Sequence, residues 1–159
     1  MILAEYIDPC QQIRHAIIRH LQGLCGGFAR PLPQTQIRGV LDVSGDPKDS
    51  AGIVVGCDNA GEHWGANNRG ILIDVSPRIV CFSHINEDAD GSICNALVSD
   101  VANAIRSIHY DGLLGWEVKW NGNWMIGEYT MDGSYRQCEM SARLPLVRLF
   151  DIDNSHSEI

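Results

Sequence analysis

The stretch between residues 71 and 109 constrains the fold of this chain more than any other part of the sequence. It begins with a long strand pattern, continues through an acidic turn at 86–91 and ends in a helical pattern at 92–109. Apolar residues recur along the helical part at steps of three and four residues, which places them on one face of a helix. They are Cys94, Leu97, Val101, Ala104, Ile105 and Ile108. This pattern predicts one long helix that packs across a sheet.

A shorter helix is predicted near the N-terminus. Asp8 suits the N-cap of a helix, and Pro9 suits the first helical position because the missing N–H of proline would have no partner there. The glycine pair at 26–27 predicts the end of this helix. An apolar stripe with helical spacing lies between them, at Ile13, Ile17, Leu21 and Leu24.

Two long segments rich in glycine, proline or asparagine, 28–52 and 58–70, are predicted to be loops. The first contains a short strand pattern at 37–43, and a second strand is predicted at 52–57. The long strand at 71–85 contains Pro77, which cannot donate a hydrogen bond to a neighbouring strand. Pro77 therefore predicts that this strand lies at a sheet edge, or is bulged or broken at this point.

The part of the chain after the long helix has the pattern of three strands, at 116–120, 124–130 and 135–149. The dipeptides Asn121-Gly122 and Asp132-Gly133 predict tight hairpin turns between them. The predicted class is α+β: a mostly antiparallel sheet with one long amphipathic helix packed across it and a shorter N-terminal helix, in the order α-β-β-α-β-β-β. Residues 1–150 form one domain in this interpretation, and residues 151–159 form a polar, acidic tail that is frayed.

Charge, apolar runs and cysteine content argue against several classes of protein. The net charge of −8 argues against a non-specific nucleic-acid binder, because neutralising phosphates requires clustered lysine and arginine, but it allows a protein that lies near DNA without binding it. We expect neither a signal peptide nor a membrane-spanning segment, since the sequence lacks a basic leader and an apolar run of about 20 residues. The six cysteines are scattered, which favours free thiols in a cytoplasmic protein.

The acidic turn imitates the start of a calcium-binding loop, with oxygen-bearing side chains at Asn86, Asp88 and Asp90 followed by Gly91. The twelfth position of such a loop holds a glutamate, and here it is Leu97. A helix also follows directly, so Asp90 or Ser92 would cap it. We interpret this turn as a helix cap.

Other combinations of reactive residues are weaker. Cys81 and His84, with Cys57 and His63, offer zinc ligands, but strand alternation places Cys81 and His84 on opposite faces. A thiol nucleophile with a histidine base is possible on composition alone, although cysteines in apolar patterns are inert. The glycines at 65–70 precede a strand and lack the lysine of a phosphate-binding loop. We therefore expect no catalytic residue, no cofactor and no metal.

The order of these elements resembles the tail terminator, or tail completion, proteins of long-tailed bacteriophages and prophages. The similar features are the N-terminal helix at 8–24, the strand–helix unit at 71–109, and a final strand at 135–149 with arginines on its polar face. The resemblance implies a non-enzymatic homo-oligomer, typically a hexameric ring. Such a ring caps the tail tube and contacts the head–tail connector. It assembles in the host cytoplasm and ends in the virion tail.

For such a ring we predict an interface between the 44–69 loops of one subunit and the sheet edge of the next. Its expected contacts are Asp58, Glu62, Trp64 and Arg69. Two alternatives stay open: a small acidic binding module such as an immunity or inhibitor protein, and a metal- or thiol-dependent enzyme. The acidic charge suits the former, because it would steer the chain towards a cationic partner.

Overall fold

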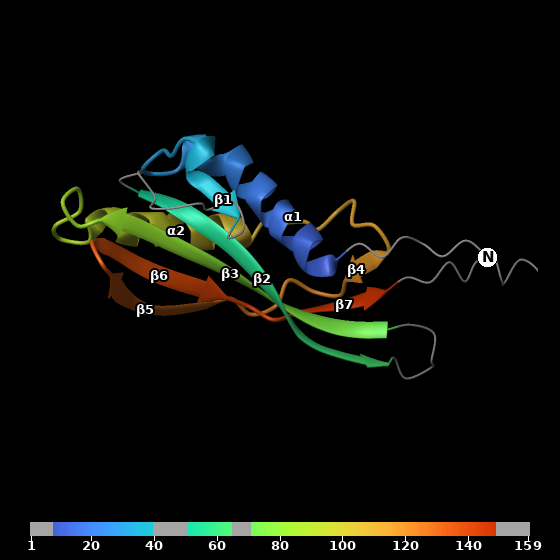
Figure 1. Cartoon of the computed structure of the whole chain (residues 1–159). Helices are drawn as coiled ribbons and strands as arrows, with labels where there is room; N and C mark the ends of the chain where they lie inside the picture. Colours follow the sequence, from blue (N-terminus) through green and yellow to red (C-terminus); the bar gives the residue numbers. More distant parts are fainter. Residues whose placement is uncertain (1–7, 40–50, 65–70, 149–159) are drawn as a thin grey trace, which may run out of the picture.

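The computed structural model describes residues 8–39, 51–64 and 71–148 of the chain (Figure 1). Two helices and a seven-stranded sheet form an α+β architecture, which confirms the predicted class. The elements are α1 (Pro9–Leu24), the short 3-10 helices η1 (Cys25–Gly27) and η2 (Gln34–Gln36), β1 (Ile37–Gly39), β2 (Ala51–Trp64), β3 (Ile71–His84), α2 (Ser92–Ile105), β4 (Trp116–Val118), β5 (Met125–Asp132), β6 (Tyr135–Ser141) and β7 (Leu144–Arg148).

The sheet has the order β1-β2-β3-β6-β5, and β7 continues the sheet beside β3, with β4 outside it. Among the described strands, only β1 and β2 run parallel, and the other pairs are antiparallel. The prediction of a mostly antiparallel sheet is therefore confirmed. The chain order differs in detail, since β1 precedes β2 and four strands rather than three follow α2.

Strand β3 is central in the sheet, so the prediction that Pro77 lies in an edge strand was wrong. On one side, β3 pairs with β2 along its whole length. On its other side, β3 pairs with β7 at Leu72–Val75 and with β6 at Arg78–His84. Pro77 lies at the junction between these two partners, and its carbonyl accepts a hydrogen bond from the Ala142 N–H at 3.2 Å. A residue's N and O point to the same side of a strand. The missing donor of Pro77 therefore faces the junction, where no strand partner is in register.

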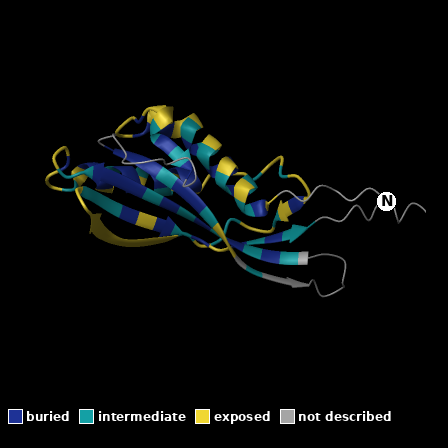
Figure 2. Cartoon of the chain, viewed as in Figure 1, coloured by how far each residue is buried: buried dark blue, intermediate teal, exposed yellow. Residues whose placement is uncertain are grey.

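Both helices pack on one face of the sheet. In Figure 1, α2 lies behind β2 and β3, and in Figure 2 the buried residues concentrate in the central strands and the helix faces turned towards them. One continuous core joins the helices to the strands, and it includes Ile13, Ile17, Leu21, Ile53, Val55, Ile79, Leu97, Val101, Ile105, Met140, Leu144 and Leu146. The apolar stripes predicted for the two helices are buried as expected, except that Leu24 is exposed.

Helix α1 begins as predicted, with Asp8 as N-cap and Pro9 at the first position. The Asp8 carboxylate accepts a hydrogen bond from the Cys10 N–H at 3.0 Å. Helix α2 ends at Ile105, four residues before the predicted end. Its last carbonyls bind side chains instead: Ala104 O accepts from Ser107 Oγ at 2.9 Å, and Ile105 O accepts from Asn121 Nδ2 at 3.0 Å.

The acidic turn does cap α2, but the capping residue is Asp88 rather than Asp90 or Ser92. Its carboxylate accepts hydrogen bonds from the N–H groups of Ile93 and Cys94, each at 2.9 Å. Asp90 accepts from the N–H of Ser92, at 3.0 Å. Gly91, the N-cap residue, has a left-handed backbone with φ of 82°, which glycine adopts without strain.

The Asn121-Gly122 hairpin was a wrong prediction. β4 pairs with β7 rather than with β5. The Asn121 side chain bonds to Ile105 O and accepts from Tyr110 Oη at 2.8 Å, which holds this segment against the end of α2. Gly122 is required here because its φ is +66°, and a Cβ would lie 2.7 Å from the Arg143 carbonyl. The Asp132-Gly133 hairpin is confirmed, since Asp132 pairs with Tyr135.

Two further strand predictions need correction. The segment 58–70 is not all loop, because β2 continues to Trp64 and pairs with β3 up to Ile71. The single strand predicted at 135–149 is two strands, β6 and β7, each paired with a different half of β3. The short strand expected at 37–43 is β1 at Ile37–Gly39. Residues 40–50 and the tail 151–159 lie outside the described residues.

Within the described parts of the chain, no helix is long and apolar enough to span a membrane.

Candidate interaction surface

Strand β5 is the most exposed element of the sheet. It pairs with β6 on one side and with no described strand on the other. All eight of its residues are exposed. Four of them are large and hydrophobic: Met125 (71% exposed), Ile126 (54%), Tyr129 (44%) and Met131 (53%).

Such a strand is unusual at a sheet edge. Edge strands are normally short, or carry lysine or proline, because their unpaired N–H and C=O groups recruit other strands. β5 contains neither lysine nor proline, and its charged residues are Glu128 and Asp132. Its pairing with β6 is irregular only between Ile126 and Tyr129. The opposite edge, β1, is three residues long. β5 is therefore suited to bind protein by strand pairing or by apolar contact.

Two hydrogen bonds hold β5 in place, one to α2 and one to β6. The hydroxyl of Tyr129 donates a hydrogen bond to Asn95 Oδ1 on α2 at 2.9 Å. The thiol of Cys138 on β6 also donates to the carbonyl of Gly127 at 3.4 Å. These bonds orient the strand, so its apolar side chains are presented on a fixed backbone.

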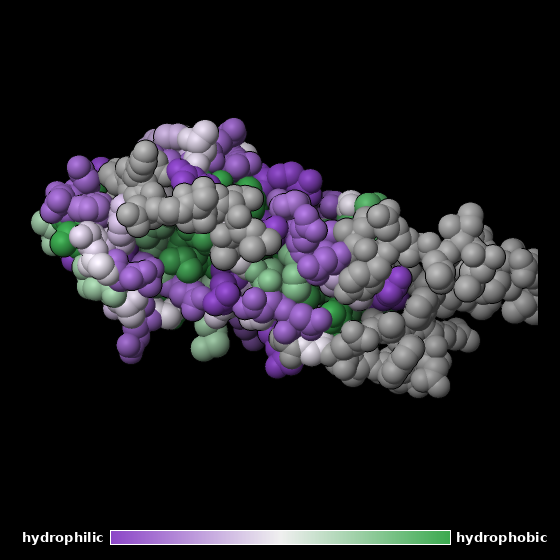
Figure 3. Space-filling model, in the orientation of Figure 1, coloured by the Kyte–Doolittle hydropathy of each residue, from purple (hydrophilic) through white to green (hydrophobic). Residues whose placement is uncertain are grey.

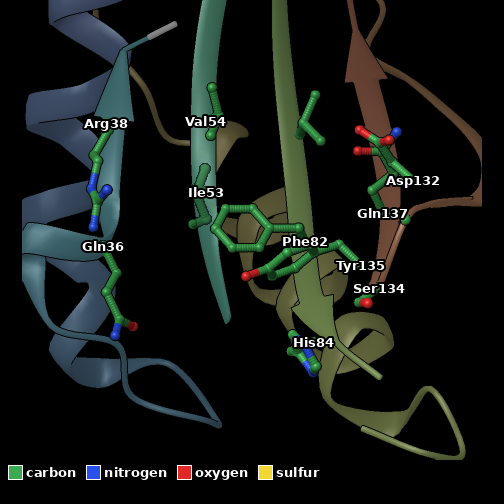
Figure 4. Close-up of a pocket in the computed structure, with 12 residues that line it drawn as sticks. Gln36, Arg38, Ile53, Val54, Phe82, His84, Asp132, Ser134, Tyr135 and Gln137 are labelled. Carbon is green, nitrogen blue, oxygen red and sulfur yellow. The ribbon is translucent and has the colours of Figure 1, made fainter. Parts of the chain in front are cut away.

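The sheet face opposite the helices carries a hollow of about 600 Å³ between β1, β2, β3 and β6 (Figure 4). Phe82 lies across β2 in this hollow, and a Cβ on Gly52 would come within 2.6 Å of its ring. Tyr135 meets Phe82 and His84 edge-on, at ring centroid distances of 5.7 Å and 5.1 Å. Figure 3 shows apolar surface on this face, with polar residues below it in the view. The hollow adds a second apolar surface, next to the hairpin that joins β5 to β6.

Of the four residues predicted at the subunit interface, three lie in β2. Asp58 is exposed and forms an ion pair with Arg78 at 3.0 Å. Glu62 and Trp64 belong to β2, where they pair with Ile73 and Ile71 in β3. Arg69 lies outside the described residues. Asp58, Glu62 and Trp64 therefore lie within the outer half of β2, which is a paired strand and not a loop.

Two of the residues considered for metal chemistry, Cys81 and His84, are separated in the fold. Cys81 is buried in the core, while His84 contacts Tyr135 on the opposite face, as alternation predicted. Burial raises the pKa of the Cys94 thiol to about 11, and burial also raises the pKa of Cys138. Among the described residues, no three His, Cys, Asp or Glu side chains are arranged to hold a metal ion. Cys57 instead adjoins Cys10.

Sequence reasoning did not identify β5 as a binding edge. The available signal was the adjacent pair Met125 and Ile126, because neighbouring residues of a strand point to opposite faces. Apolar side chains on both faces indicate a strand buried on both faces or one that binds a partner. Only the sheet order shows that β5 is at the edge.

Comparison with known proteins identifies the fold alone. No family model matches the chain, and no curated protein matches its sequence. A solved structure whose name carries no functional description is similar, with a TM-score of 0.51 and 16% sequence identity. The match covers 88% of this chain and 95% of the other. At this identity the similarity supports a shared α+β architecture.

Proposed function

We propose that this chain is a non-enzymatic structural protein of a phage or prophage tail. In this proposal it forms a ring that caps the tail tube and contacts the head–tail connector. The observation that carries the proposal is the exposed, apolar edge strand β5. An edge of this kind on a small acidic domain is suited to permanent contact with another protein subunit.

A ring requires two different patches on each subunit, because a heterologous interface joins one patch to another. β5 supplies one patch. The outer half of the β2–β3 hairpin supplies the other, since it projects from the opposite end of the sheet (Figure 1). The hairpin carries Asp58, Glu62 and Trp64, and Arg69 follows in sequence. In the proposed ring these residues contact β5 of the next subunit, and six subunits close the circle.

The charge of the chain fits this role. A net charge of −8 repels the DNA phosphates that pass through a tail, so DNA moves past the ring without binding.

The same charge also favours the second candidate, an acidic binding module that occupies a cationic toxin. The neighbouring genes discriminate between them: genes for tail tube and tape-measure proteins support the ring, whereas an adjacent toxin gene supports the binding module.

The decisive experiment substitutes β5. Ile126→Lys places a charge on the apolar edge, and Leu114→Lys is the matched control because Leu114 is similarly exposed but lies outside β5. We expect Ile126→Lys to weaken subunit association by about 2 kcal/mol, or roughly 30-fold. Native mass spectrometry at several protein concentrations measures the effect. Leu114→Lys should associate like the unchanged chain.

Some rings form only on the tail, so the assay is repeated with polymerising tail-tube protein. Electron microscopy then measures tube length in the presence of each variant. We expect the unchanged chain and Leu114→Lys to stop tube growth and Ile126→Lys to leave it unlimited. Equal tube lengths with and without the unchanged chain would contradict the proposed function, and equal activity of all three proteins would remove β5 from the interface.

A further inference from the structure

Two cysteines from distant parts of the sequence meet where the first turn of α1 lies against β2. Cys10 is the second residue of α1, and Cys57 is in the middle of β2, opposite Pro77. Each thiol is the neighbour with the largest effect on the pKa of the other. Both line a surface hollow of about 290 Å³, together with Asp8, Arg14, Arg78 and other residues. The fold therefore places a pair of reduced thiols side by side at the surface.

This pair differs from the other cysteines in its access to solvent. Cys10 and Cys57 are half-buried, whereas Cys25, Cys81, Cys94 and Cys138 are buried. Exchange between a thiol and a disulfide requires the attacking sulfur to reach its partner. A reagent in solution can therefore reach the Cys10–Cys57 pair in the folded protein, while the other four thiols become available only when the chain unfolds.

The surroundings give the two thiols different roles. The neighbouring Cys57 thiol lowers the pKa of Cys10. Burial and the charges of Asp8 and Asp58 oppose this shift, and the charge of Arg14 adds to it. The N-terminus of α1 also favours a thiolate at this position. The neighbouring Cys10 thiol, together with burial, raises the pKa of Cys57. Cys10 is therefore the thiol that attacks the small disulfide, and Cys57 is the thiol that attacks Cys10 in the second step.

We propose that Cys10 and Cys57 form a reversible dithiol–disulfide site that reacts with small disulfides of the oxidised-glutathione class. The Cys10 thiolate attacks one sulfur of the small disulfide, which forms a mixed disulfide and releases one thiolate. That thiolate takes the proton of Cys57, and the Cys57 sulfur then attacks Sγ of Cys10. The Cys10–Cys57 bond forms as the second small thiol leaves. Two protein thiols are oxidised and one small disulfide is reduced to two thiols.

The new bond would join the first turn of α1 covalently to the central part of β2. It closes a long loop of chain, and cross-links of this kind stabilise mainly by restricting the unfolded state. We expect the oxidised protein to melt about 5 to 15 °C higher than the reduced protein. A small thiol such as reduced glutathione in excess should reverse the shift.

Peptide mapping tests the site directly. The folded, full-length chain is incubated with excess oxidised glutathione, alkylated with iodoacetamide, digested without reduction and analysed by mass spectrometry. We expect one linked peptide pair containing Cys10 and Cys57, and two fewer alkyl groups after unfolding than in the untreated chain. A linkage between other cysteines, or no linkage with both thiols still open to alkylation, would overturn the proposal.

Serine variants test the two roles. Cys57→Ser should stop at the mixed disulfide, so glutathione stays on Cys10. Cys10→Ser should slow the reaction of Cys57 with oxidised glutathione at least tenfold. Cys25→Ser is the matched control and should form the Cys10–Cys57 bond at the unchanged rate. A stable glutathione adduct on the unchanged chain, without closure to the disulfide, would also contradict the proposal, and this readout needs no variant to fold.

Discussion

Asp88 is the residue on which the local structure around α2 depends most. Its side chain is fully buried, yet it is held by the N–H groups of Ile93 and Cys94, the hydroxyl of Ser83 at 2.7 Å, and the Arg136 guanidinium at 3.7 Å. Arg136 also donates to the Asp88 carbonyl at 2.9 Å. A buried carboxylate is tolerable only with such complete hydrogen bonding.

Replacing Asp88 with asparagine should therefore destabilise the protein strongly. Asp88→Asn removes the charge that faces Arg136 and leaves one backbone donor of α2 poorly paired. We expect a loss of about 3 kcal/mol in the free energy of unfolding, measured by urea denaturation. Asp90→Asn is the control, since Asp90 is exposed and its amide analogue can still accept from the Ser92 N–H. A loss below about 1 kcal/mol for Asp88→Asn would contradict this account.

The stability of the protein should also depend on pH through Asp88. Burial raises the pKa of its carboxyl, but the hydrogen bonds from Cys94, Ile93 and Ser83 and the charge of Arg136 outweigh burial, so the pKa is lowered overall. A lowered pKa in the folded state means that the unfolded state binds more protons below pH of about 4. The contribution of Asp88 is therefore complete above that pH and is lost as the pH falls further.

Urea denaturation at pH 6, 4 and 3 measures this dependence. We expect the stability difference between the unchanged chain and Asp88→Asn to be largest at pH 6 and to shrink at pH 3. A difference that stays constant across this range would show that Asp88 does not contribute through its charge.

At the scale of elements, the end of α2 is joined to the segment before β5 by Asn121. Its amide nitrogen donates to Ile105 O, and its Oδ1 accepts from the Tyr110 hydroxyl and from Trp124 Nε1 at 3.3 Å. One side chain thus satisfies a helix-terminal carbonyl and two aromatic donors. This arrangement separates β4 from β5 and directs the chain towards the sheet edge.

Asn121→Ala should loosen this connection. It leaves the Ile105 carbonyl and the Tyr110 hydroxyl without these partners, and we expect a loss of about 2 kcal/mol in the free energy of unfolding. Thermal unfolding followed by circular dichroism gives the measurement. Asn123→Ala is the control, because Asn123 is exposed. Equal melting temperatures of the two variants would disprove the role given to Asn121.

At the scale of the whole molecule, the sheet has two unlike ends. The outer hairpin of β2 and β3 projects at one end, supported by β7 on one side of β3, and β5 lies at the other. Asp74 in this outer part pairs with Arg143 at 3.0 Å, so the hairpin is fixed to the segment that joins β6 and β7. A molecule with two unlike patches can assemble head to tail, and closure of that assembly gives a ring.

The hairpin side of the proposed ring is tested by Trp64→Ala and Arg69→Glu. We expect either change to reduce the mass measured by light scattering, because an aromatic anchor or a charge contact is lost from every interface of the ring. Arg30→Glu serves as a control, since Arg30 is exposed and lies in the segment after α1. An unchanged oligomer in both test variants would remove these residues from the interface and leave β5 to be judged separately.

The sequence by itself determined the features that depend on near neighbours. The cap of α1 at Asp8, the buried stripes of both helices and the Asp132-Gly133 turn each follow from residues within a few positions of one another. Helix periodicity and turn chemistry act over this short range. The α+β class followed from the same signals.

Only the tertiary structure decided which strands pair and which remain at the edge. Asn121-Gly122 has the signature of a hairpin, but its amide binds the end of α2 and β4 pairs with β7 instead. Pro77 is tolerated in a central strand because its missing donor faces the junction between β6 and β7. The meeting of Cys10 with Cys57 and the exposure of β5 also depend on contacts between residues far apart in sequence. Strand pairing is settled by such distant contacts, which local patterns do not encode.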